Sequence, residues 1–301
     1  MHDARLSTVV GGLVFPEGLR WRRDRLWFTD VEARRVYCCD TNGIVLAAFE
    51  STQHPVGLGW DTDGTLIIST LEHRLLRYAG GVLDDGIDLA GHVPYNGNDL
   101  VVDGRGRAYY GSVGAPMDRP TEFTGAGSVV LVDADGPRSV AEDLSFPNGM
   151  VLTPDGSTLI VAESVGRRLT RFRVGADGSL SDRAVFAPLD TIPDGICLDA
   201  EGAVWVACPT TTEVQRVREG GEVLERIATG RTVLDVELGG DDGQTLYVAT
   251  APDISHTRAG EGPHTGKIEQ ARVDVPASRS NGRSGPASRS YGRSGPASSR
   301  G

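Results

Sequence analysis

The chain has 301 residues, of which 39% are hydrophobic and 24% charged, and its formal net charge at pH 7 is −11. The apolar share suffices for a folded core, and the negative charge argues against nucleic acid or an anionic membrane as a partner. No apolar run approaches the roughly 20 residues that span a bilayer, and the N-terminus does not look like a secretion signal, so we expect a soluble, cytoplasmic protein.

A unit that recurs along the chain predicts the fold. Each unit starts with proline, one variable residue and glycine, and continues through short apolar runs separated by turns. The starts are, in chain order, Pro16-Glu17-Gly18, Pro55-Val56-Gly57, Pro147-Asn148-Gly149 and Pro193-Asp194-Gly195, with degenerate copies at Asn98-Asp99 and Leu234-Asp235. The variable residues lie 39 to 50 residues apart, a spacing typical of propeller blades.

The apolar runs of each unit predict short strands. In chain order they cover residues 26–30 and 35–37, 66–68 and 75–78, 108–110, 159–161 and 169–172, 204–206 and 214–217, and 246–248. They are too short, and too rich in Val, Ile, Trp and Tyr, for helical repeats. We therefore predict an all-β protein, a six-bladed β-propeller with four-stranded antiparallel blades around a central channel, over residues 1–275.

The end of the chain has a different composition. Residues 276–301 repeat Ser, Arg, Gly and Pro, and contain five arginines and no acidic residue. Because this segment has almost nothing apolar to bury, it cannot offset the loss of chain entropy on folding. We predict that it is a disordered tail.

The variable residue of each unit predicts a functional site. In a propeller the first strand of each blade lines the channel, so one position recurs around the axis. We assign to this ring Glu17, Val56, Asn98, Asn148, Asp194 and, in the sixth unit, Asp235. Buried carboxylates and amides need partners, so five oxygen-bearing side chains around one axis indicate a hard cation, Ca²⁺, Mg²⁺ or Mn²⁺ before Zn²⁺. A polar, water-filled channel would show the same pattern, so periodicity leaves both interpretations open.

Four segments of the chain recur in one known family in the same order and at the same spacing. They are FPEGLRWRRDRLWFTD (15–30), NDLVVDGRGRAYYGS (98–112), FPNGMVLTPDGSTLIVAESVGRRLTRF (146–172) and PDGICLDAEGAVWVA (193–207). In these segments the chain resembles the SMP-30/gluconolactonase/regucalcin-like family. The resemblance implies a six-bladed propeller with one catalytic divalent ion, acting most often on lactones.

The resemblance also implies roles for single residues. The family's metal ligands match Glu17, Asn148 and Asp194. Asn98 matches an asparagine that in relatives binds the metal or holds substrate and water, and Asp99 follows it as in many members. Asn96 stands where some relatives carry a substrate-contacting arginine, a departure that bears on which lactone is accepted. We predict that Asn96, Asn98 and Asp99 bind the substrate.

The predicted function is that of a divalent-metal-dependent lactonase, a carboxylic ester hydrolase. We expect one metal ion, Ca²⁺ first, with Zn²⁺, Mn²⁺ or Mg²⁺ as alternatives, and Asp194 as the base that activates water. A small lactone is the expected partner, and the protein is expected to be a monomer or dimer. A phosphotriesterase-like hydrolase and a non-catalytic ligand-binding propeller with a structural metal remain alternatives. The GxSxG, HExxH, Walker A and GxGxxG motifs of other enzyme classes are absent.

Overall fold

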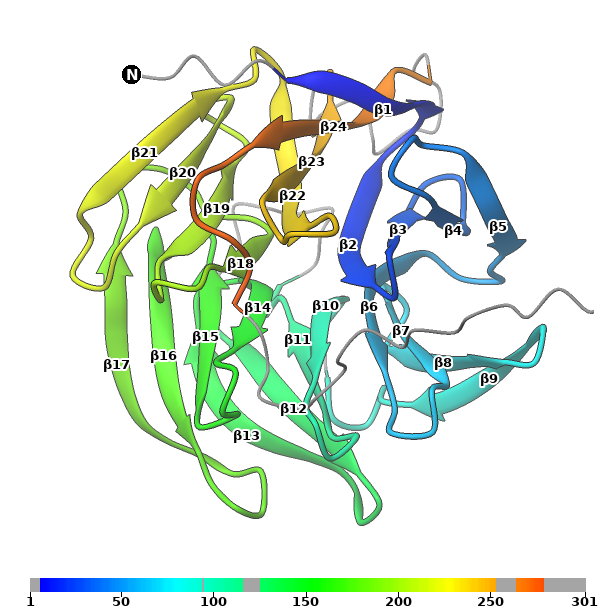
Figure 1. Ribbon diagram of the computed structural model, residues 1–301. Helices are drawn as coiled ribbons and strands as arrows, with labels where there is room; N and C mark the ends of the chain where they lie inside the picture. The colour runs from blue at the N-terminus through cyan, green and yellow to red at the C-terminus, as the bar shows by residue number, and fades with distance from the viewer. Residues whose placement is uncertain (1–5, 94, 116–124, 253–263, 279–301) are drawn as a thin grey trace, which may run out of the picture.

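Six sheets arranged around a common centre make up the protein (Figure 1). The computed structural model describes residues 6–93, 95–115, 125–252 and 264–278. Within these ranges the chain forms 24 strands, and each sheet contains four of them in antiparallel pairing. The predicted six-bladed propeller with four-stranded blades is thereby confirmed.

The blades follow one another along the chain, and each begins with its innermost strand. Blade 1 consists of β2 (Pro16–Arg22), β3 (Arg25–Asp30), β4 (Arg35–Cys39) and β5 (Val45–Glu50). Blade 2 consists of β6 (Pro55–Trp60), β7 (Leu66–Thr70), β8 (Arg74–Ala79) and β9 (Val82–Asp88). Blade 3 consists of β10 (Gly97–Val102), β11 (Ala108–Ser112), β12 (Gly127–Asp133) and β13 (Gly136–Leu144).

The remaining blades repeat this order, except that the last one also takes up the first strand of the chain. Blade 4 consists of β14 (Pro147–Leu152), β15 (Thr158–Glu163), β16 (Arg168–Val174) and β17 (Leu180–Pro188). Blade 5 consists of β18 (Ile196–Leu198), β19 (Val204–Cys208), β20 (Glu213–Val217) and β21 (Val223–Ala228). Blade 6 consists of β22 (Thr232–Gly239), β23 (Thr245–Ala251), β24 (Gly266–Arg272) and, outermost, β1 (Ser7–Leu13). The pairing of β1 with β24 closes the ring.

The core lies between the faces of neighbouring blades. One apolar cluster joins Trp205 and Val214 of blade 5 to Val233 and Leu246 of blade 6. Inner strands are therefore covered on both faces: every residue of β7 is buried, whereas β9, at the outer edge of the same blade, is largely exposed. Burial on both faces explains why the inner runs of the sequence are continuously apolar.

The glycine of the recurring unit lets the innermost strands converge. A Cβ atom at Gly149 of β14 would lie 2.7 Å from both the carbonyl oxygen of Asp194 and the amide nitrogen of Ile196 in the next blade. At Gly18, where φ is +59°, a Cβ would lie 2.1 Å from the carbonyl oxygen of Val56. A side chain does not fit at either place, so glycine is what allows the residues before it to approach one axis.

The first residues of the predicted tail contact the propeller. The amide of Ala277 donates to the carbonyl of Gly243 at 2.8 Å, and the amide of Ser278 donates to that of Leu198 at 3.0 Å. These bonds join the chain end to blades 5 and 6. The rest of the predicted tail, residues 279–301, lies outside the described residues. None of the described segments is a helix with the length and apolarity that a membrane crossing needs.

Candidate active site

Four polar side chains of the predicted ring occupy equivalent places on the innermost strands. Glu17, Asn98 and Asn148 are each the second residue of their strand, β2, β10 and β14. Asp194 lies two residues before β18, in a segment still paired with β19, since its amide donates to the carbonyl of Ala207 at 2.9 Å. Blades 1, 3, 4 and 5 thus each place one oxygen-bearing side chain at the same end of the channel.

The sixth position of the ring is Val233, and the prediction that it is Asp235 is wrong. Glu17 pairs with Thr29, one residue before the end of β3, and the equivalent pair in blade 6 is Val233 with Thr250, one residue before the end of β23. Asp235 lies two residues further along β22. The sixth unit lacks Pro-x-Gly, so its sequence gave no fixed point for the strand register.

Glu17 carries a carboxyl group whose neighbours disfavour its ionised form. Burial raises the pKa of Glu17 well above its usual value, and the negative charges of Asp194, Asp235 and Asp99 raise it further. The backbone amide of Gly18 opposes this shift. The charged groups with the largest effect on the pKa of Glu17 are therefore all acidic.

Asp194 is in the same situation. Its exposed fraction is 7%, and burial followed by the charge of Asp235 raises the pKa of Asp194 well above its usual value. A hydrogen bond from the side chain of Asn148 partly offsets this shift. Glu17 and Asp194 thus both lie among acidic groups, and neither forms an ion pair with a cationic side chain among the residues that the structure describes.

The two amides of the ring are oriented by the protein frame. Asn148 Nδ2 donates to Ser164 Oγ at 3.3 Å, and that hydroxyl donates to the carbonyl of Pro193 at 2.7 Å. Asn98 Nδ2 donates to the carbonyl of Pro147 at 3.4 Å. Because the amide nitrogens bond to the frame, the amide oxygens are the groups that remain for a ligand.

These side chains form a donor set made of oxygen alone. Two carboxylates and two amide oxygens suit a hard divalent cation such as Ca²⁺, which prefers oxygen ligands. Nowhere in the described ranges do three or more His, Cys, Asp or Glu side chains come together as a metal-binding cluster. The set therefore depends on the two amides, and Asp235 does not complete a cluster with Glu17 and Asp194.

The other two predicted substrate-binding residues are engaged with the protein. Asn96 Nδ2 donates to the carbonyl of Leu71 at 3.2 Å and so connects blades 2 and 3. The carboxylate of Asp99 accepts bonds from Arg20 at 2.8 and 2.9 Å and from the amide of Leu100 at 2.8 Å. Their roles toward a substrate, like that of Asn98, stay predictions.

Sequence reasoning missed Arg20, which lies three residues after Glu17 on β2. Its guanidinium group contacts Asp99 and lies 3.9 Å from Asp235 Oδ2. The signal was available, because an arginine between Leu19 and Trp21 in an inner strand has to find a partner inside the channel. What that partner is depends on other blades.

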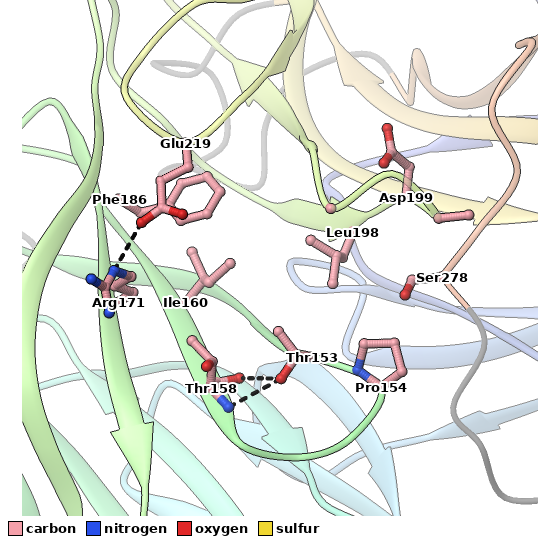
Figure 2. A pocket seen from close by; sticks show the side chains of 12 residues that line it. Thr153, Pro154, Thr158, Ile160, Arg171, Phe186, Leu198, Asp199, Glu219 and Ser278 are labelled. Carbon is pink, nitrogen blue, oxygen red and sulfur yellow. Dashed lines mark hydrogen bonds and ion pairs between the residues drawn. The ribbon is translucent and has the colours of Figure 1, made fainter.

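A surface hollow of about 460 Å³ lies away from the ring (Figure 2). It is lined by the turn after β14, by Phe186, and by the turn after β18 with Ser278 at its edge. No ring residue lines it, and Arg171, the cation at its wall, is paired with Glu219 at 3.0 Å. The hollow is therefore not part of the candidate site at the channel mouth.

Comparison with known proteins gives relatives over most of the chain. The chain is 29% identical over 282 residues to pentonolactonase XacC of Haloferax volcanii, covering 87% of this chain and 91% of the relative. It is 26% identical to the 6-deoxy-6-sulfogluconolactonase of Pseudomonas putida, covering 85% and 89%. The solved structure of a calcium-binding protein, regucalcin, from Agrobacterium tumefaciens has the same fold, with a TM-score of 0.75, 20% identity, and 92% and 96% of the two chains covered.

The sequence profile named SMP-30/Gluconolactonase/LRE-like region matches residues 15–252. This range contains the innermost strands of all six blades and every residue of the ring. The family predicted from the four sequence segments is confirmed by this match. The chain therefore belongs to the SMP-30/Gluconolactonase/LRE-like family.

Proposed function

We propose that the protein is a lactonase that opens the ring ester of a small lactone at the channel mouth, with one divalent metal ion, Ca²⁺ first, held by Glu17, Asn148 and Asp194. Membership of the family and two relatives named as lactonases, each aligned over more than four fifths of both chains, support the hydrolase class. The observation that carries the metal is the pair of carboxyl groups of Glu17, which is half-buried, and Asp194, which is buried; neither forms an ion pair with a cationic side chain in the described part of the chain.

A divalent ion held there would supply positive charge beside the substrate carbonyl oxygen, where negative charge develops during attack by water. Asp194 is the proposed base. It carries a buried carboxyl group, its backbone amide is bonded to the carbonyl of Ala207, and a carboxylate held in place in this way can accept a proton from water. Asn148 donates to this carboxylate and keeps it oriented.

Asn98 is proposed to hold the substrate or the attacking water with its amide oxygen, since its nitrogen is bonded to the carbonyl of Pro147. In the reaction, the oxygen of water bonds to the carbonyl carbon and the ring C–O bond breaks. The ring oxygen takes up a proton and becomes a hydroxyl group, and the product is an open-chain hydroxy acid. Acid release therefore reports the reaction directly.

The test is a panel of pentono- and hexonolactones, one sulfonated gluconolactone and one phosphotriester, assayed by acid release. Each is measured with Ca²⁺, Mn²⁺ or Zn²⁺ added and with EDTA. Hydrolysis of a lactone that EDTA abolishes and metal restores is the expected result. Turnover of the phosphotriester alone would favour the other hydrolase class, and metal binding without any turnover would favour a non-catalytic propeller.

A further inference from the structure

Arg20 lies inside the channel, close to the proposed metal site, and only 15% of its side chain is exposed. The hydrogen-bond acceptors around its guanidinium group are all oxygen atoms. Nη1 donates to the carbonyl of Leu19 at 2.7 Å, and Nη2 donates to Asp99 Oδ1 and Oδ2 at 2.8 and 2.9 Å and to the carbonyl of Leu100 at 2.8 Å. Asp235 Oδ2 lies 3.9 Å from Nη1. One side chain of blade 1 thus reaches acidic groups of blades 3 and 6.

The carboxylates of Asp99 and Asp235 each lie where the neighbouring blade carries glycine. A Cβ atom at Gly57 of blade 2 would lie 2.2 Å from Asp99 Oδ1, and one at Gly195 of blade 5 would lie 1.9 Å from Asp235 Oδ1. Asp235 also accepts the amide of Leu19 at 2.6 Å. Both carboxylates therefore occupy places where a side chain is missing on the neighbouring blade, and they are held on either side of Arg20.

The acidic groups of the channel thereby divide into two sets. Asp99 and Asp235 face the guanidinium of Arg20, and Glu237, whose Oε1 accepts the amide of Trp21 at 3.1 Å, lies within reach of the same charge. Glu17 and Asp194 form no ion pair with a cationic side chain in the described part of the chain, and the charges that act on them most strongly are acidic. A positive side chain therefore already stands where the first set would otherwise need a cation.

We propose that Arg20 is the resident cation of the channel: it pairs with Asp99 and lies against Asp235, and so leaves Glu17 and Asp194, which form no ion pair in the described part of the chain, as the carboxyl groups that hold a single divalent ion. In this role Arg20 is a positioning residue. It holds Asp99, the residue next to Asn98, and ties blades 1, 3 and 6 together at the axis. The single-ion part of the proposal rests on the proposed function, whereas the role of Arg20 toward Asp99 and Asp235 does not.

Removing the charge of Arg20 would leave five oxygen atoms without a cation: both of Asp99, one of Asp235, and the carbonyls of Leu19 and Leu100. An all-oxygen group of this kind suits a divalent ion. The experiment compares the wild type with Arg20→Met, Arg20→Lys and the double variant Arg20→Met/Asp99→Asn. It measures bound Ca²⁺ per chain by equilibrium dialysis, and the melting temperature in EDTA and in Ca²⁺.

We expect Arg20→Met to bind one more Ca²⁺ per chain than the wild type. In EDTA it should melt about 5–10 °C lower, because breaking a buried ion pair leaves an uncompensated charge, and Ca²⁺ should restore most of the loss. Arg20→Lys, which keeps the charge, should show the wild-type stoichiometry. The double variant should bind no extra ion and lose less stability than the single one. If Arg20→Met does not fold, the comparison of the double variant with the wild type tests the proposal.

Unchanged stoichiometry and melting temperature in Arg20→Met would overturn the proposal. A double variant that is as unstable as the single one would also overturn it, since Arg20 would then act through packing and not through charge. The proposed function fails by a different result, namely a wild type that binds no divalent ion or opens no lactone. The difference between variants in bound Ca²⁺ still decides the role of Arg20 in that case.

Discussion

Buried acidic residues occur both in the channel and within the blades, and their surroundings differ. Glu163, at the end of β15, has no exposed surface. Its carboxylate accepts bonds from Arg168 at 2.7 and 2.9 Å and from the amide of Ser145 at 2.8 Å. Burial alone would raise the pKa of Glu163, but Arg168, Thr170 and Ser145 hold it below its usual value. For Glu17 and Asp194, burial is reinforced by negative neighbours and the shift is upward.

The comparison shows that the partners of a buried acid, more than its burial, distinguish a structural group from one arranged for a ligand. Glu163 has its cations supplied by its own blade, through Arg168 and Arg183. Asp99 has its cation supplied across the channel by Arg20. Glu17 and Asp194 have none in the described part of the chain, which is the condition under which an external cation gains the most from binding.

The largest expected effect is on catalysis, from Asp194→Asn. An amide cannot accept the proton of the attacking water, so turnover should fall by about 10²–10⁴-fold and stay low at saturating metal. The measurement is the rate of acid release against metal concentration. Val56→Ala, at the same ring position in blade 2, is the control and should change turnover little. Full recovery of Asp194→Asn at high metal would remove the assignment as base and leave it as a ligand.

A second prediction is that neutralising an acid has opposite effects in the two regions. In EDTA, Glu17→Gln should raise the melting temperature by about 2–4 °C, the shift that about 1 kcal/mol produces in a domain of this size, because it removes repulsion with Asp194. Glu163→Gln should lower the free energy of unfolding by about 1–3 kcal/mol, since Arg168 loses its ionic partner. Thermal melting and urea titration of both variants in EDTA measure the change in melting temperature and in free energy of unfolding relative to the wild type. Effects of the same sign would contradict the comparison.

A third prediction concerns pH. Burial raises the pKa of Asp235 from its usual 3.8 to about 8, although Arg20 opposes the shift. Between these values the folded protein retains a proton that the unfolded chain releases, so the free energy of unfolding should decrease as pH rises from about 4 to about 8. Melting curves in EDTA across this range test the slope, and Asp235→Asn should flatten it. A stability that increases with pH in EDTA would show that Arg20 keeps Asp235 ionised.

The smallest effects should come from residues 276–301, which carry positive charge and which the composition predicts to be disordered. Truncation after Ser278 removes five arginines, and it should change neither the melting temperature nor the affinity for Ca²⁺, because exposed charges beyond about 10 Å are screened at ordinary salt. Truncation after Val275 also removes the bonds of Ala277 and Ser278 and should lower the melting temperature by a few degrees. If truncation after Ser278 changes the affinity for Ca²⁺, the arginines of residues 279–301 act on the channel, contrary to this prediction.

Repetition along the chain was enough to predict the number of blades and the four polar members of the ring. Glu17, Asn148 and Asp194 stand between proline and glycine in the first, fourth and fifth units, and Asn98 is found by the turn and strand that follow it. Repetition makes this possible, because each blade uses the same local chemistry to start its innermost strand. A single unit would not identify any of these residues.

Which of the channel acids have a partner depends on contacts between blades that are far apart in the sequence. Asp235 is two residues away from the sixth ring position because the pairing of β22 with β23, and not the spacing of charges, sets its register. Arg20 and Asp99 are 79 residues apart and lie on blades separated by a third. Their contact is possible because Gly57, on the inner strand of blade 2, leaves room for the carboxylate of Asp99. The sequence of a single strand does not show which residues of other blades converge on it.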